Sequence, residues 1–181
     1  MDPRLLGSPQ HRIETATHPM PNLLDEHNVV LTPAYRILSL RDADADAGHD
    51  PDNALGQAYA TVAASTGTEL HLVCAQAELP VAVGLRLWDT DPAVTAQGDG
   101  VGLTAPLEVE FATGLVVLSS PTAEAVDFRL LTGPGTYAAV VEHSGRTSAE
   151  QHRPNADPAS NEVSHETYTI NLWRTGDIED D

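Results

Sequence analysis

The chain has 181 residues, of which 41% are hydrophobic, and this length fits one ordinary domain. It carries 27 acidic residues against nine basic ones, all of them arginines, so its formal net charge is −18 at pH 7. A protein this acidic is repelled by phosphate backbones and by anionic membrane surfaces. The charge therefore argues against direct binding of nucleic acid or membranes.

Three features that the sequence lacks narrow the class of protein. No window approaches the roughly 20 apolar residues of a membrane helix, and the first residues lack the basic-then-apolar order of a signal peptide. Cys74 is the only cysteine, which excludes an intrachain disulfide and a zinc site built on several thiolates. We expect a soluble, cytoplasmic protein.

The first 27 residues are rich in proline and show no sustained periodicity. Such a segment buries too little apolar surface to offset the entropy of ordering, so 1–27 is predicted to be a disordered leader. A single β domain is predicted over 28–175. Residues 176–181 are expected to form an acidic tail.

Within the domain, the dominant pattern is the two-residue alternation of half-buried strands. It is clearest over 106–112, where Leu107, Val109 and Phe111 alternate with Glu108 and Glu110. About nine strands are predicted in all, the others over 34–40, 57–64, 68–75, 81–89, 114–119, 126–131, 136–143 and 166–174.

Short turn clusters at 65–67, 112–114 and 132–135 separate consecutive strands and favour antiparallel hairpins and meanders. No stretch shows a convincing helical period, although the alanine content of 54–64 is also compatible with a helix. The fold class is therefore predicted as all-β, an antiparallel β-sandwich or jelly-roll, with a closed barrel as the alternative.

Three linkers are long enough to suggest binding surfaces, at 41–56, 90–104 and 145–164. The first contains closely spaced carboxylates that could face a partner: Asp42, Asp44, Asp46, Asp50 and Asp52. An EF-hand calcium loop starting at Asp42 would need glycine and glutamate where Ala47 and Asn53 stand. A solvated acidic loop is the alternative interpretation, because GC-rich coding and adaptation to salt also produce acidic chains without lysine.

Catalytic and cofactor motifs are not recognisable. The eight histidines lack the paired spacing of metal ligands, so no metal and no cofactor are assigned. Cys74 lies in line with Leu70 and Leu72 and is expected to be a small buried residue, not a nucleophile. No nucleophile elbow is present, and the glycines at 98–102 lie before a strand, not between a strand and a helix. We expect no enzymatic activity, and a glycoside-active enzyme is the catalytic alternative.

The order of the segments resembles the competence-protein-J family of small β proteins. The segments that carry the resemblance are Tyr35-Arg-Ile-Leu, Gly-Gln-Ala-Tyr-Ala at 56–60, the strand pair within 68–88, Pro106-Leu-Glu-Val-Glu-Phe111, Gly114-Leu-Val-Val-Leu-Ser119, Phe128-Arg-Leu-Leu, Gly133-Pro-Gly-Thr-Tyr137 and Tyr168-Thr-Ile-Asn-Leu-Trp173. A group of actinobacterial proteins with a Gly-Thr-Tyr strand and a late tryptophan strand is similar in the same way. The similarity spans roughly 29–174.

This resemblance implies a non-catalytic protein that inhibits a partner nuclease. Because a nuclease cleft is basic, a carboxylate-rich protein can occupy it. The expected partner is thus a basic protein such as a nuclease or toxin, bound through the five aspartates. The alternative is a β-sandwich module that binds calcium or a small ligand. An exposed edge strand at 166–174, with Trp173 outward, could also pair across a homodimer.

Overall fold

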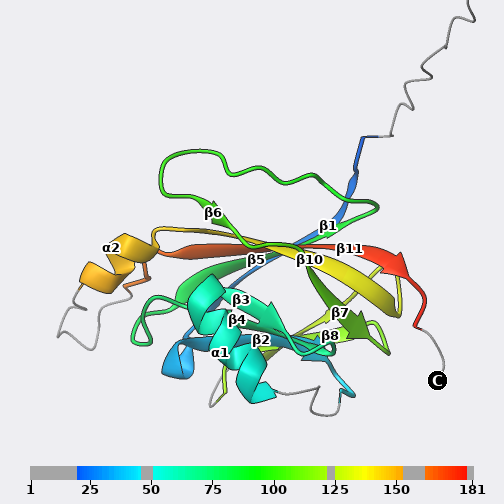
Figure 1. Ribbon diagram of the computed structural model, residues 1–181, viewed down its shortest axis with the longest axis horizontal. Helices are drawn as coiled ribbons and strands as arrows, with labels where there is room; N and C mark the ends of the chain where they lie inside the picture. Colours follow the sequence, from blue (N-terminus) through cyan, green and yellow to red (C-terminus); the bar gives the residue numbers. More distant parts are fainter. Residues whose placement is uncertain (1–19, 46–50, 122–124, 153–161, 179–181) are drawn as a thin grey trace, which may run out of the picture.

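The structure, a computed structural model, describes residues 20–45, 51–121, 125–152 and 162–178, and it consists of two β-sheets packed face to face (Figure 1). Eleven strands form these sheets in the described part of the chain: β1 Leu23–Leu31, β2 Ile37–Asp42, β3 Ala63–Ser65, β4 Glu69–Val73, β5 Val81–Trp88, β6 Gly102–Leu103, β7 Leu107–Phe111, β8 Leu115–Ser119, β9 Ala125–Arg129, β10 Gly135–Ser144 and β11 Thr167–Gly176. The predicted all-β sandwich is confirmed, with two more strands than expected.

The six-stranded sheet has the order β1-β5-β11-β10-β6, and β7 also pairs with β10. The five-stranded sheet has the order β3-β4-β2-β8-β9. All pairs are antiparallel except β11 with β5, which is parallel. The short turns had suggested a purely antiparallel sandwich, and this one parallel pair departs from that prediction.

The three predicted turns do not all make hairpins. The turn at 65–67 joins the paired strands β3 and β4, as expected. The other two carry the chain from one sheet to the other, since β7 pairs with β10 while β8 pairs with β2 and β9. Gly114 makes this crossing possible, because a Cβ there would lie 2.8 Å from the backbone carbon of Gly133. The prediction of hairpins at these two turns is wrong.

The core lies between the two sheets and is made of the residues that the alternation placed inward. Val109 and Phe111 on β7 have no exposed surface, whereas Glu108 is exposed. Tyr168, Ile170 and Leu172 on β11 are likewise buried in the main apolar cluster. Cys74 belongs to the same cluster and is fully buried, as predicted.

The strand predicted at 57–64 is wrong. This part of the chain forms helix α1, Pro51–Thr61, followed by the short strand β3. Alanine is the best helix former, and Ala54 and Ala58 bury one side of the helix four residues apart. Ala58 packs with Ala64 and Val73 on the outer face of the five-stranded sheet. The apolar residues of the segment thus serve helix packing, not strand alternation.

A second helix, α2, Arg146–Gln151, lies in the linker after β10, and a single turn of 3-10 helix, η1, Ala34–Arg36, precedes β2. With 11 and six residues, α1 and α2 fall well short of the roughly 20 residues that cross a bilayer. No helix in the described segments is a candidate membrane span.

The edges of the sheets differ from the expectation. Strand β1 begins at Leu23, within the segment predicted as leader, and forms one edge of the six-stranded sheet. Strand β11 lies between β5 and β10, and Trp173 is only 9% exposed. The prediction of an edge strand at 166–174 is therefore wrong, and that strand has no free side for pairing across a dimer.

Candidate functional site

The first of the five predicted aspartates is a buried residue with a structural role. Asp42, at the end of β2, is 1% exposed. Its carboxylate accepts hydrogen bonds from the main-chain N–H of Thr113 at 2.8 Å and from the Thr113 hydroxyl at 2.8 and 3.0 Å. It also accepts the main-chain N–H of Asp44 at 3.0 Å. Asp42 therefore fixes the turn between β7 and β8 and does not face solvent.

The remaining four aspartates divide into two groups. Asp44 is exposed after β2, and Asp52 is exposed in the first turn of α1. Asp46 and Asp50 lie outside the described residues. Because Thr113 and Asp44 already engage the Asp42 carboxylate, Asp42 is not available as the first ligand of a calcium loop. Among the described residues, no three histidine, cysteine, aspartate or glutamate side chains converge to hold a metal ion.

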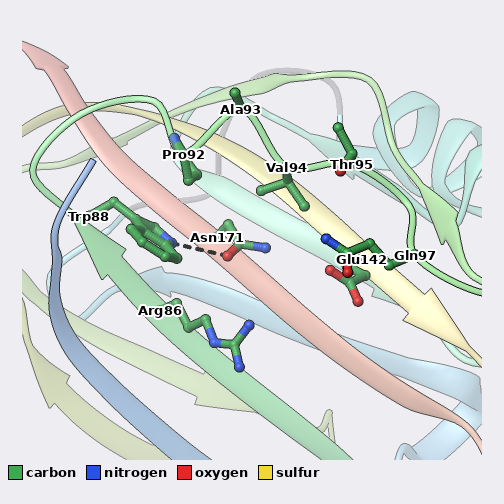
Figure 2. A pocket seen from close by; sticks show the side chains of 9 residues that line it. All are labelled: Arg86, Trp88, Pro92, Ala93, Val94, Thr95, Gln97, Glu142 and Asn171. Atoms are coloured by element: carbon green, nitrogen blue, oxygen red, sulfur yellow. Dashed lines mark hydrogen bonds between the residues drawn. The ribbon is translucent and has the colours of Figure 1, made fainter. Parts of the chain in front are cut away.

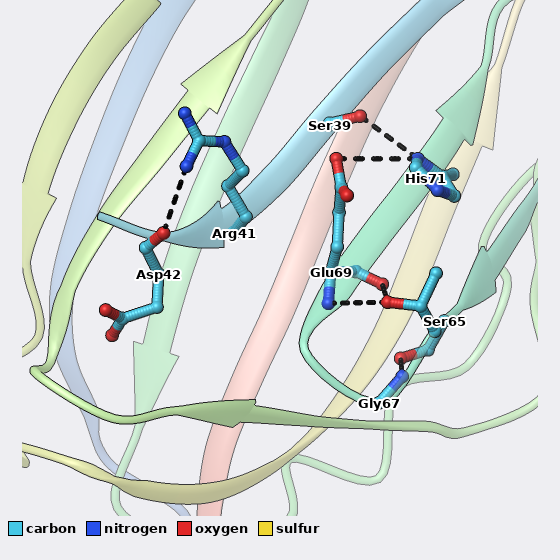
Figure 3. A network of polar contacts seen from close by, with 8 residues as sticks. Ser39, Arg41, Asp42, Ser65, Gly67, Glu69 and His71 are labelled. Atoms are coloured by element: carbon cyan, nitrogen blue, oxygen red, sulfur yellow. Dashed lines mark hydrogen bonds and ion pairs between the residues drawn. The ribbon is translucent and has the colours of Figure 1, made fainter. Parts of the chain in front are cut away.

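A serine, a histidine and a glutamate meet on the five-stranded sheet (Figure 3). The Ser39 hydroxyl lies 3.0 Å from Nδ1 of His71, and Glu69 Oε1 lies 3.7 Å from the same nitrogen. A catalytic triad needs the two ring nitrogens to face different partners, one the nucleophile and the other the acid. Here both side chains approach Nδ1, so the cluster lacks the geometry that would activate Ser39.

A buried polar network lies between β4, β11 and α2. Glu166 has no exposed surface, and its carboxylate accepts hydrogen bonds from Ala75 N at 2.7 Å, Gln76 Nε2 at 3.0 Å and the Tyr168 hydroxyl at 2.7 Å. Arg146, from α2, donates to the Tyr168 oxygen at 2.5 Å and to the carbonyl of Val73 at 2.6 Å. The network ties helix and sheets together.

The electrostatics of this network disfavour a reactive thiol. Burial, followed by the negative charge of Glu166, raises the pKa of Cys74 from 9.0 to about 12. Burial also raises the pKa of Tyr168 above its usual range. Because the thiolate is the nucleophilic form, Cys74 is unreactive at neutral pH.

The second predicted linker covers a cleft on the outer face of the six-stranded sheet. Arg86 on β5 is level with Asn171 on β11, and Glu142 on β10 pairs with the residue two positions before Asn171. These three side chains and Trp88 form the floor, and residues of 92–97 form the cover (Figure 2). This space, which we name the Asn171 cleft, has a volume of about 350 Å³. Ligand pockets begin at about this size.

The cover of the Asn171 cleft is set by a tight turn. The Asp91 carboxylate accepts the main-chain N–H of Ala93 at 2.7 Å, and Ala93 adopts a left-handed conformation with φ 48°. The chain then runs over the sheet towards β6 (Figure 1). The linker at 90–104 was predicted as a binding surface, but its length alone did not identify the side chains on the sheet beneath it.

The fold and its sites define a two-sheet β protein with an acidic charge and a polar cleft on one sheet. No model of a known protein family matches the sequence, and no curated protein is significantly similar to it. Two solved structures share the fold.

The first is the crystal structure of ComJ from Bacillus subtilis, an inhibitor of the DNA-degrading activity of NucA. It has a TM-score of 0.53 and 11% identity, and the match covers 86% of this chain and 99% of ComJ. The second is the product of crocagin biosynthetic gene J, with a TM-score of 0.54 and 15% identity over 83% of this chain and 97% of that protein. The resemblance to the competence-protein-J family is confirmed at the level of the fold.

Proposed function

We propose that this protein is a non-catalytic inhibitor or immunity-type protein that binds a basic protein such as a nuclease. The observation that carries the proposal is the structural likeness to ComJ, a nuclease inhibitor, over 86% of the chain. The net charge of −18 supports it, because a carboxylate-rich surface attracts and orients a basic partner. A cytoplasmic location, expected from the sequence, is part of the same proposal.

The proposed contact surface is the acidic segment after β2. Asp42 is left out of the contact residues because its side chain is buried. Asp44 and Asp52 present exposed carboxylates at its two ends. Asp46 and Asp50 stay in the proposed set on the sequence pattern alone. Asp42 contributes indirectly, because its hydrogen bonds to Thr113 and Asp44 hold the start of the segment.

Affinity capture from the lysate of the source organism, followed by a DNA-degradation assay on the captured fraction, tests the function. At about 0.15 M salt, where long-range charge contacts are already screened, we expect a basic protein to be retained and to be released at higher salt. Added in excess, this protein should then suppress DNA degradation by the released fraction. Retention of no basic protein, or DNA degradation by the released fraction that excess protein leaves unchanged, would refute the proposal.

A pair of charge-matched variants tests the surface. The double variant Asp44→Asn, Asp52→Asn should slow association and flatten its salt dependence, as measured by surface plasmon resonance against the captured partner. The control Glu78→Gln, Glu150→Gln removes the same charge from exposed positions near α2 and should leave association nearly unchanged. Asp42→Asn should instead lower the free energy of unfolding by about 2 kcal/mol, because a buried hydrogen-bond acceptor is weakened. Equal association rates for both double variants would refute this surface.

A further inference from the structure

The Asn171 cleft contains a buried amide nitrogen that has no hydrogen-bond partner among the described residues. Asn171 is 2% exposed, and its Oδ1 accepts the indole N–H of Trp88 at 3.0 Å. Because an indole nitrogen only donates, the atom facing it must be the amide oxygen, and this fixes the orientation of the amide. The amide nitrogen then points away from Trp88, towards the side of Glu142 (Figure 2), and forms no hydrogen bond with the described residues.

The charge left unpaired in the cleft is negative. Arg86 also lines the cleft, but its Nε donates to Glu26 of β1 at 2.7 Å, and the charge of this glutamate balances that of the guanidinium. Glu142 is half-buried, and its carboxylate forms no hydrogen bond or ion pair within the described part of the chain. The cleft is therefore lined by a carboxylate and an amide N–H donor that both lack a partner among the described residues, in a protein whose net charge is −18.

The residues that line the Asn171 cleft favour one kind of cation over another. A group that suits the cleft must place a positive charge on Glu142 and a hydrogen-bond acceptor on the Asn171 amide nitrogen. The indole of Trp88 lines the same cleft and offers an aromatic surface for a planar cation or for methylene groups. A guanidinium is planar, binds a carboxylate through two parallel N–H groups and stacks on aromatic rings, which an ammonium does less well.

We propose that the Asn171 cleft binds an arginine side chain of a protein partner, with its guanidinium on Glu142 and a main-chain carbonyl of the same segment on the Asn171 amide nitrogen. Naming a basic protein as the source of this arginine rests on the proposed function. The contact adds a specific anchor to the general attraction of an acidic surface, since a buried anchor in a pocket contributes more binding energy than rim charges.

The test is an NMR titration of the full chain with N-acetyl-arginine amide, which carries the guanidinium and two amide carbonyls. We expect saturable shifts of the Trp88 indole N–H and the Asn171 side-chain amide at millimolar concentration. N-acetyl-citrulline amide has the same shape without the charge and should bind about two- to fivefold more weakly, so at equal subsaturating concentration it should shift these signals correspondingly less. Equal shifts with both probes, or none with arginine, would overturn the proposal and leave a bridging water as the occupant.

A matched pair of variants separates the cleft from the overall charge. Glu142→Gln should weaken binding of N-acetyl-arginine amide by about two- to fivefold, the range of an ion pair that water partly screens. Glu108→Gln removes the same charge from an exposed position on β7 in the same sheet and should leave the affinity unchanged. Equal weakening by both variants would show bulk attraction and would overturn the site.

The outcomes also separate this site from the inhibitor function. Saturable binding of the arginine probe supports the cleft even if no DNA-degrading activity is suppressed. Suppression of that activity by wild type and by Glu142→Gln alike, with no shift of the Trp88 or Asn171 signals, supports the inhibitor function and overturns the cleft.

Discussion

Two buried polar side chains of this sandwich, Glu166 and Asn171, differ in whether their hydrogen-bonding atoms have partners. The carboxylate of Glu166 accepts three hydrogen bonds of 3.0 Å or less, from Ala75, Gln76 and Tyr168. The oxygen of the Asn171 side chain accepts the indole N–H of Trp88, whereas its nitrogen has no partner among the residues that the structure describes. Both residues lie on or next to β11, and both are at least 98% buried. The first group is used for stability, whereas the second keeps a donor for something outside the chain.

The largest expected effect comes from breaking the network that is complete. Glu166→Ala leaves the N–H of Ala75 and the hydroxyl of Tyr168 without the acceptor they have in the fold, and the Gln76 amide keeps only the carbonyl of Leu79. A buried donor left unpaired costs about 1 to 3 kcal/mol, so the free energy of unfolding should fall by about 3 kcal/mol or more. Urea denaturation followed by tryptophan fluorescence measures it.

The control for this variant is Glu150→Ala, which removes an exposed glutamate from α2. It should change the free energy of unfolding by less than about 0.5 kcal/mol. A loss for Glu166→Ala as small as that of the control would mean that the network around Glu166 does not stabilise the fold.

A smaller effect is expected from the thiol next to the network. The pKa of Cys74 rises from 9.0 in the unfolded chain to about 12 in the fold. The contribution of the protonated thiol is therefore complete below about pH 9 and is lost as the pH rises towards 12, because the unfolded chain releases the proton first. The loss amounts to at most about 1.4 kcal/mol per pH unit in that window.

Comparison of wild type with Cys74→Ala isolates this term. Urea denaturation at about pH 8 and about pH 10 should show wild type losing about 1.4 kcal/mol more than the variant between the two values. Both proteins retain Tyr168, so its own titration cancels in the difference to first order. Parallel loss of stability in the two proteins would contradict the raised pKa.

Sequence patterns predicted the parts of the fold that depend on neighbours along the chain. The alternation over 106–112 and 166–174 placed the inward residues of β7 and β11 correctly, because a strand with one face towards water alternates polar and apolar residues. The same alternation puts Trp173 outward, together with Asn171 two positions before it, but it could not show that both residues are buried. For Asn171 the cover comes from residues of 92–97, more than 70 positions away in the chain.

The acidic segment shows the same limit for the proposed site. Asp42 and Asp44 stand in the same alternating run and carry the same side chain, so no local pattern separates them. The difference is made by Thr113, 71 positions from Asp42, whose N–H and hydroxyl donate to Asp42 and not to Asp44. Charge and spacing could identify an acidic segment, but the long-range pairing of β2 with β8 decides which of its carboxylates face outward.

The smallest effect is expected at Asn171 itself. Asn171→Ala removes the hydrogen bond to Trp88, worth about 1 kcal/mol, but it also removes the unpaired amide N–H, whose burial costs about as much. The Trp88 side chain is half-buried, so water can take over its indole N–H. The free energy of unfolding should change by less than about 1 kcal/mol, measured by urea denaturation beside Glu166→Ala. A loss as large as that of Glu166→Ala would mean that Asn171 is a structural residue and not a donor kept for a ligand.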